Sequence, residues 1–280
     1  MRHRKPKPRW RSRLVVVGLL PVAFLVTWDE PVREAAYSPR RQGPERAGTF
    51  PGVPRPEVVP RSGWNADEEM VRESASPLGG VRSVFIHHTN QPNDYECSDV
   101  PRLLRMLEKD HIQRGWDDLG YNFIVDRCGK VYEGRAGGLT RSVEGAHTKG
   151  FNAHSIGIAA VGTFREGQRV PEPMVDSIAA LAAWKLQRGS DPLGRTRMTS
   201  SSDASRFDKG RKAELHVISG HVDAYTTDCP GPALYDKLGE IRKKAHRLRA
   251  RAEAGQPESS EKEARGRHGE GGRGDRKGIR

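Results

Sequence analysis

The chain has 280 residues, which allows one or two domains, and its hydrophobic fraction of 35% is low for a chain that folds throughout its length. The formal net charge of +12 is concentrated at the ends: residues 2–13 carry seven Lys or Arg and no acid, and residues 242–280 carry thirteen against six acids. Because residues 14–241 are nearly neutral, we expect no nucleic-acid partner, and we expect the basic ends to serve export and contact with anionic surfaces.

The N-terminus has the pattern of an export signal. A basic start precedes the uncharged, mostly apolar stretch 14–28 (LVVVGLLPVAFLVTW). This stretch is shorter than the ~20 residues that span a bilayer and contains Pro21, so within 1–28 a signal peptide is favoured over an uncleaved membrane anchor. Either alternative places the rest of the chain outside the cytoplasm, secreted or at the cell surface, where disulfides persist.

Strands and helices alternate in the middle of the chain. Residues 29–60 are rich in Pro, Arg and Gly and are predicted to be a disordered linker, and residues 246–280 a basic disordered tail. Between them we predict first a buried strand at 81–88, a helix from Ser98-Asp99 to about Gln113 and a β-hairpin at 121–135. A buried strand at 155–164, a helix from Pro171 to Gly189 and a polar loop at 190–212 are expected to follow. The last predicted elements are a short strand at 215–221 and a helix after Cys229-Pro230-Gly231. This interleaving predicts one mixed α/β domain over 61–245, and we expect a monomer.

The three cysteines are an odd number, so one of them needs a separate explanation. Cys97 precedes the first helix and Cys128 lies in the hairpin turn, and both lie beside surface turns where a disulfide can join them. Cys229 is then left over, eight residues after His221 and directly before the start of a helix. A thiolate at a helix N-terminus has a lowered pKa and can act as a nucleophile or a metal ligand.

A histidine from the stretch VFIHH (84–88) would complete a set of two histidines and one cysteine with His221 and Cys229. Three protein ligands and one open position are typical of catalytic zinc. Adjacent side chains on a strand point to opposite faces, so only one of His87 and His88 is expected to reach such a site. Spacing alone leaves three simpler interpretations open: core histidines, a buried thiol and a capping cysteine.

Four motifs in the middle of the chain resemble the peptidoglycan recognition protein and type 2 N-acetylmuramoyl-L-alanine amidase family, which includes the phage lysozyme-type amidases. They are FIHHT (85–89), GWDDLGYNFIVDRCGKVYEGRAGG (115–138), GAHTKGFNAHSIGIAAVGTF (145–164) and GHVDAYTTDCPG (220–231). The resemblance covers about residues 61–245. It implies a central mixed β-sheet with flanking helices and a zinc site at one end of a groove.

Carried over position by position, the resemblance implies His87, His221 and Cys229 as zinc ligands. It implies Tyr121 as the catalytic tyrosine and Thr227 as the residue that assists at the scissile carbonyl, where the family has Lys or Thr. It fits a Cys97–Cys128 disulfide. It places His147 near the groove, where contact with substrate and a plain loop histidine both remain open.

The resemblance implies zinc-dependent hydrolysis of the amide between N-acetylmuramoyl groups and L-alanine in peptidoglycan. The main alternative is a non-catalytic peptidoglycan-binding module, although family members that keep the cysteine tend to be enzymes. A cysteine hydrolase using Cys229 and His221 would lack an orienting residue and leave His87 unused. One departure from the family is Val222, where many relatives have Arg after the Gly-His pair.

Overall fold

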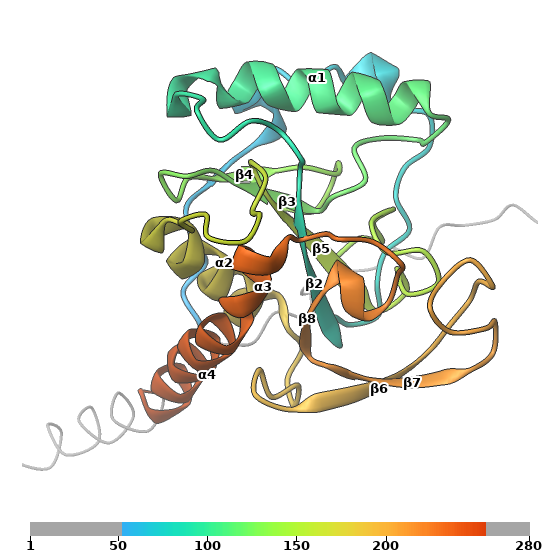
Figure 1. Cartoon of the computed structure of the whole chain (residues 1–280), viewed down its shortest axis with the longest axis vertical. Helices are drawn as coiled ribbons and strands as arrows, with labels where there is room; N and C mark the ends of the chain where they lie inside the picture. Colours follow the sequence, from blue (N-terminus) through green and yellow to red (C-terminus); the bar gives the residue numbers. More distant parts are fainter. Residues whose placement is uncertain (1–51, 256–280) are drawn as a thin grey trace, which may run out of the picture. The chain divides into compact units, whose positions relative to one another are not determined.

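Six strands form the central sheet of this computed structural model, which describes residues 52–255 (Figure 1). Their order is β1-β4-β3-β5-β2-β8, with β3 and β4 antiparallel and all other neighbours parallel. The bounds are Val58–Val59 (β1), Ser83–His88 (β2), Phe123–Val125 (β3), Val131–Glu133 (β4), Ser155–Ala160 (β5) and Ile218–Gly220 (β8). The expected mixed sheet is therefore confirmed.

The two longest strands, β2 and β5, owe their place to continuous apolar runs. Every residue of both strands is buried. Side chains of a central parallel strand are covered on both faces, so such a strand has no alternating polar positions. β2 lies between β5 and β8, and all three strands run in the same direction, so their carboxyl ends meet at one edge of the sheet.

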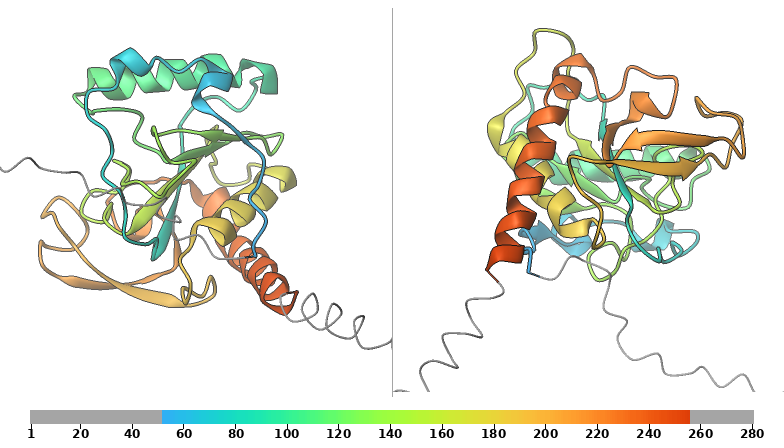
Figure 2. Two further views of the ribbon diagram at one scale, coloured as in Figure 1. Left: turned by 180° about the vertical axis from the view of Figure 1, so that it is seen from behind. Right: turned by 90° about the horizontal axis from the view of Figure 1, so that it is seen from below.

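Helices cover the two faces of this sheet (Figures 1 and 2). On one face, α1 places Leu104 and Leu107 against Ile124 and Ala159 of the strands. On the other face, α2 and α4 close a larger core. The helices are α1 (Val100–Gln113), α2 (Glu172–Lys185), the short α3 (Pro232–Asp236) and α4 (Leu238–Ala254), with 3₁₀ turns η1 (Arg61–Trp64), η2 (Glu68–Met70), η3 (Cys97–Asp99) and η4 (His221–Asp223).

The structure differs from the sequence prediction in four segments. Residues 215–221, expected to be one short strand, contain the end of β7 (Lys212–His216), β8 and the start of η4. Residues 190–212, expected to be a loop, contain β6 (Arg195–Thr199), which pairs antiparallel with β7 (Lys212–His216). Only Met198 of β6 is buried, so the strand has too few apolar residues to show a period. β1 lies within the expected linker, and α4 continues past residue 245, the expected end of the domain, with Arg249 buried. The guanidinium of this arginine donates hydrogen bonds to the carbonyl groups of Ala183 and Leu186 at the end of α2.

Two cross-links fix the surroundings of α1. The Cys97–Cys128 disulfide is present and ties η3, just before α1, to the turn between β3 and β4. The buried Arg61 donates to Glu108 of α1 at 2.7 Å and to Asp118 at 3.2 Å. Burying these charges is tolerable because each one is paired.

All described residues fall within one compact unit. The expected export segment 1–28, residues 29–51 of the expected linker and residues 256–280 of the expected tail lie outside the described residues. Within residues 52–255, none of the helices has the length and apolar character needed to span a membrane.

Candidate functional site

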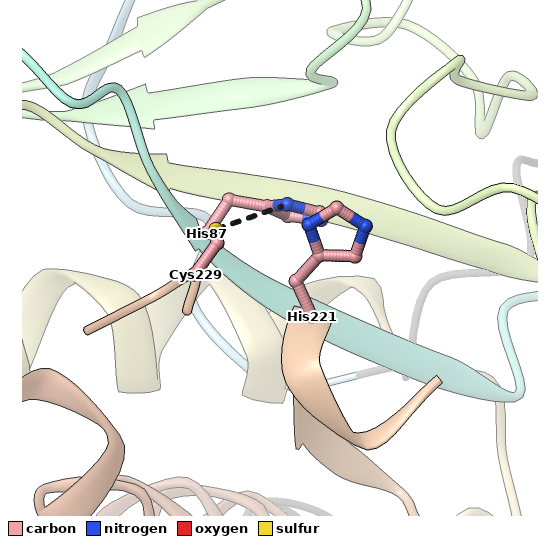
Figure 3. Close-up of side chains that lie close together, drawn as sticks. All are labelled: His87, His221 and Cys229. Atoms are coloured by element: carbon pink, nitrogen blue, oxygen red, sulfur yellow. Dashed lines mark hydrogen bonds between the residues drawn. The ribbon is translucent and has the colours of Figure 1, made fainter. Parts of the chain in front are cut away.

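The parallel strands bring together the three residues that the sequence suggested as metal ligands (Figure 3). Ile86 of β2 pairs with Gly220, the last residue of β8. His87 of β2 and His221, which directly follows β8, therefore lie side by side with ring centroids 4.4 Å apart. Cys229 approaches from the segment before α3, and its Sγ lies 3.7 Å from Nδ1 of His87. One ligand atom from each of the three residues lies within 4.8 Å of the others.

The adjacent histidines of β2 separate as strand alternation predicts. His87 is 1% exposed and joins the cluster. His88 is also buried, but it contributes its backbone N–H, which donates to Sγ of Cys229 at 3.3 Å. A backbone donor stabilises the negative charge of a thiolate. His88 therefore supports the cysteine through the main chain, and its ring does not belong to the three-residue cluster.

The second ring nitrogen of His87 has its own polar partners. Its Nε2 lies 3.2 Å from Nδ1 of His147 and 3.3 Å from Oγ1 of Thr148, and these two atoms are 2.9 Å apart. Nδ1 of His87 therefore faces Cys229 while Nε2 is held by neighbours. Metal-bound histidines usually have such a partner on the free nitrogen, which fixes the tautomer and the ring orientation.

The His147 ring occupies space that is open only because two neighbouring residues are glycines and have no side chain. A Cβ at Gly157 of β5 would lie 2.4 Å from Cγ of His147, and one at Gly145 would lie 2.6 Å from its Cδ2. Both distances are far below van der Waals contact, so only glycine is compatible with this ring position. Thr148 was not identified from the sequence, although it lies inside the GAHT motif; its contact with His87 joins positions 61 residues apart.

Burial determines the protonation of the cluster. It lowers the pKa of His87 well below its ordinary range, with further lowering by His221 and His147, and it lowers the pKa of His221 to about 4 and of His147 to about 3. The imidazoles are thus neutral near pH 7, as metal ligands must be. Two neutral imidazoles and a cysteine within one ion's reach form a donor set suited to zinc.

The expectation of a thiolate with a lowered pKa at Cys229 is wrong for the metal-free protein. Burial, with a smaller contribution from Asp228, raises the pKa of Cys229 to about 12, although the His88 N–H acts in the opposite direction. The helix that follows, α3, has only five residues and does not overcome this effect. A thiol that stays protonated is a poor nucleophile, which disfavours a cysteine hydrolase.

Tyr121 and Thr227 both lie beside the cluster. The half-buried Tyr121 ring is 5.2 Å from the His87 ring and 5.5 Å from the His111 ring. Burial, followed by the Cys229 charge, raises the Tyr121 pKa, so its hydroxyl remains a proton donor. Oγ1 of Thr227 accepts a hydrogen bond from the backbone N–H of Cys229 at 3.2 Å, which leaves the hydroxyl proton of Thr227 available.

A cleft of about 380 Å³ opens beside His221. His147 and His221 form part of its lining, and Trp116, Lys149 and Tyr225 form other parts. The Tyr225 ring stacks on His221 at 5.2 Å with an interplanar angle of 13°. Trp116 is the tryptophan of this cleft, whereas Trp64 and Phe151 are buried in the core. Tyr225 was not identified from the sequence.

The sequence and the fold of this chain are similar to those of known proteins. Residues 77–232 match the profile of a family described as N-acetylmuramoyl-L-alanine amidase. A peptidoglycan-recognition protein of Drosophila melanogaster is 29% identical over 182 residues, which are 65% of this chain and 85% of that protein. Human N-acetylmuramoyl-L-alanine amidase is 31% identical over 189 residues, which are 65% of this chain but only 28% of that protein.

The fold is also similar to a solved structure. Peptidoglycan recognition protein-LE, solved in complex with tracheal cytotoxin, a monomeric diaminopimelic acid-type peptidoglycan, matches with a TM-score of 0.51 and 26% identity. The match covers 65% of this chain and 92% of that one. Similar proteins thus include some named for hydrolysis and some named for recognition.

Proposed function

This chain belongs to the N-acetylmuramoyl-L-alanine amidase family, and we propose that it is a zinc-dependent enzyme that hydrolyses the amide between N-acetylmuramoyl groups and L-alanine in peptidoglycan. The observation that carries the proposal is the complete donor set of His87, His221 and Cys229, of which His221 also lines the cleft. Three protein donors leave a fourth position of a tetrahedral ion for water or substrate.

Zinc held by these residues would lower the pKa of a water molecule and polarise the carbonyl of the scissile amide. The side chains around it provide the rest of the chemistry. The protonated hydroxyl of Tyr121 can donate a hydrogen bond to the oxygen that gains negative charge as the amide is attacked. The free hydroxyl proton of Thr227, next to Cys229, can serve the same purpose.

The residues behind His87 keep it in place. His147 and Thr148 hold Nε2 of His87, so that Nδ1 stays directed toward Cys229. The walls of the cleft suit a sugar-peptide substrate, because the Trp116 and Tyr225 rings offer flat apolar surfaces and Lys149 offers a positive charge. We propose peptidoglycan as the partner and a secreted or cell-surface location, in which the Cys97–Cys128 disulfide is stable.

The proposal is tested by incubating the purified protein with purified cell wall, with and without a zinc chelator. We expect release of new amino termini without new reducing sugars, and loss of this activity on chelation. Binding to the wall without any hydrolysis would instead identify a recognition module, and activity that survives complete zinc removal would identify a thiol hydrolase.

The two histidines of β2 provide a matched pair of variants for the ligand assignment. His87→Ala removes a donor of the cluster, whereas His88→Ala removes a ring that does not belong to it. We expect the zinc content of the purified protein to fall sharply in the first variant and to change little in the second. The opposite order would overturn the assignment.

A further inference from the structure

A second pocket is lined in part by Asn93 and Tyr95 of the loop 89–95, which begins directly after the strand that carries His87. Its volume is about 310 Å³. Val161, Phe164 and Met174 contribute apolar surface to it, and the side chains of Arg127 and Arg169 line it as well. Val161 directly follows β5, so this pocket lies at the edge of the sheet where the parallel strands end, a common place for ligands in α/β proteins.

The positive charge of this pocket is not compensated within its walls. None of its lining residues, all of them in the described part of the chain, is acidic. Arg169 is exposed and makes no hydrogen bond or ion pair with another residue of the range 52–255. Pro171 precedes α2 and lines the pocket, so the N-terminal, positive end of the α2 dipole also lies here. Because Pro171 offers no side-chain cap, the first N–H groups of α2 have no side-chain hydrogen bond from the N-cap residue.

Arg127 is held in position before any ligand arrives. Its Nη1 donates to the carbonyl groups of Asn93 at 3.2 Å and Tyr95 at 3.3 Å, and its guanidinium lies 6.0 Å from the centroid of the Tyr95 ring. The neighbouring Cys128 is linked by the disulfide to Cys97, which fixes the hairpin turn against the same segment. The Nε and Nη2 groups remain available, and a guanidinium in a fixed position loses little entropy when it binds.

The walls of the pocket are also tied to each other. The side-chain amide of Asn93 accepts from the backbone N–H of Thr163 at 2.8 Å and donates to its carbonyl at 2.6 Å. The hydroxyl of Tyr95 accepts from the N–H of Arg127 and donates to the carbonyl of Val161. The loop 89–95, the hairpin turn and the segment after β5 therefore form one preformed pocket.

We propose that this pocket binds the free carboxylate of a short peptide with small apolar side chains. A carboxylate matches the planar fork of a guanidinium, and two arginines line this pocket. Val161, Phe164 and Met174 offer apolar surface against which small apolar side chains can pack. The inference does not depend on the proposed hydrolysis, because neither arginine belongs to the zinc cluster or to the cleft beside it.

The test is a titration of the full protein with N-acetyl-trialanine, followed by NMR or calorimetry, in parallel with its C-terminal amide and with inorganic phosphate. We expect saturable binding of the acid and at least tenfold weaker binding of the amide and of phosphate. Because N-acetyl-trialanine has no muramoyl group, its binding is measured independently of amidase activity.

Two Arg→Gln substitutions, each of which removes one positive charge, locate the binding site. Arg169→Gln changes an exposed side chain of the pocket, and Arg197→Gln changes an exposed one on β6. We expect affinity for the peptide to fall at least tenfold in the first variant and to stay within twofold of the wild-type value in the second. No saturable binding, equal affinity for acid and amide, preference for phosphate, or equal loss in both variants would each overturn the proposal.

Discussion

Gly157→Ala tests whether the position of His147 controls the metal centre, without changing any residue that would hold the metal. The added Cβ would lie 2.4 Å from Cγ and 2.8 Å from Cβ of His147. Since carbon atoms prefer separations of about 3.5–4 Å, the ring or the strand must move by about 1 Å. A shift of that size breaks the 3.2 Å contact between Nδ1 of His147 and Nε2 of His87.

Two effects of different size are expected. Overpacking a core position costs about 1–3 kcal/mol, which exceeds the modest gain from restricting the unfolded chain. Loss of a partner on the second nitrogen of a metal-bound histidine typically weakens metal affinity by about 10–100-fold. Gly157→Ala should therefore reduce the free energy of unfolding by about 1–3 kcal/mol and weaken zinc binding at least tenfold.

The assay is zinc competition with a chromophoric chelator, together with urea unfolding of the zinc-free protein. Gly79→Ala is the control, because a Cβ there meets no atom within 4 Å and the glycine does not need a positive φ. The control should change neither quantity appreciably. If Gly157→Ala binds zinc within twofold of the wild-type affinity, then His147 does not support the site in the way described.

Two further predictions concern single side chains. Tyr121→Phe should retain zinc but lower the turnover of cell wall by about 10²–10³-fold, the usual effect of losing one donor to a developing oxyanion; turnover near the wild-type value would remove Tyr121 from the chemistry. The buried Lys185 donates to the carbonyl groups of Gly138 and Arg141, and burial, followed by repulsion from Arg55, lowers its pKa to about 7. Between pH 7 and about 10, Lys185 therefore binds a proton in the unfolded chain but not in the folded protein. The contribution of Lys185 to the free energy of unfolding should thus increase as the pH rises, by about 4–5 kcal/mol at most. Urea unfolding of the wild type and Lys185→Met across this range should show a growing difference in favour of the wild type, and a constant difference would contradict the prediction.

The sequence was most informative where local pattern and tertiary environment coincide. β2 and β5 are continuous apolar runs because both of their faces are buried, and α1 shows a helical stripe because only one of its faces is. β6 could not be found in this way, because Met198 is its one buried residue and the strand depends on pairing with β7. The two residues of β1 are too few to show any period.

For the candidate site, the sequence predicted the three possible metal ligands but not the side chains that contact them. The odd cysteine count and the spacing suggested Cys229 and His221, and strand alternation allowed only one histidine of the adjacent pair to join them. The family resemblance then selected His87 over His88. The contact between Thr148 and His87 could not be found from a local pattern, because the fold brings together positions 61 residues apart. The stacking of Tyr225 on His221 was also not visible in the sequence. The raised pKa of Cys229 was also missed, because burial of the thiol is visible only in the folded chain.

Product analysis of a defined muropeptide tests the central claim most directly. The zinc-loaded protein is incubated with a disaccharide-peptide, and the masses and end groups of the products are determined, with Cys229→Ser as the matched variant. The account predicts that the wild type releases an intact disaccharide with a free lactyl carboxyl group and a peptide with a free amino group on L-alanine, and that the variant releases neither. Cleavage at another bond, or equal cleavage by the variant, would contradict it.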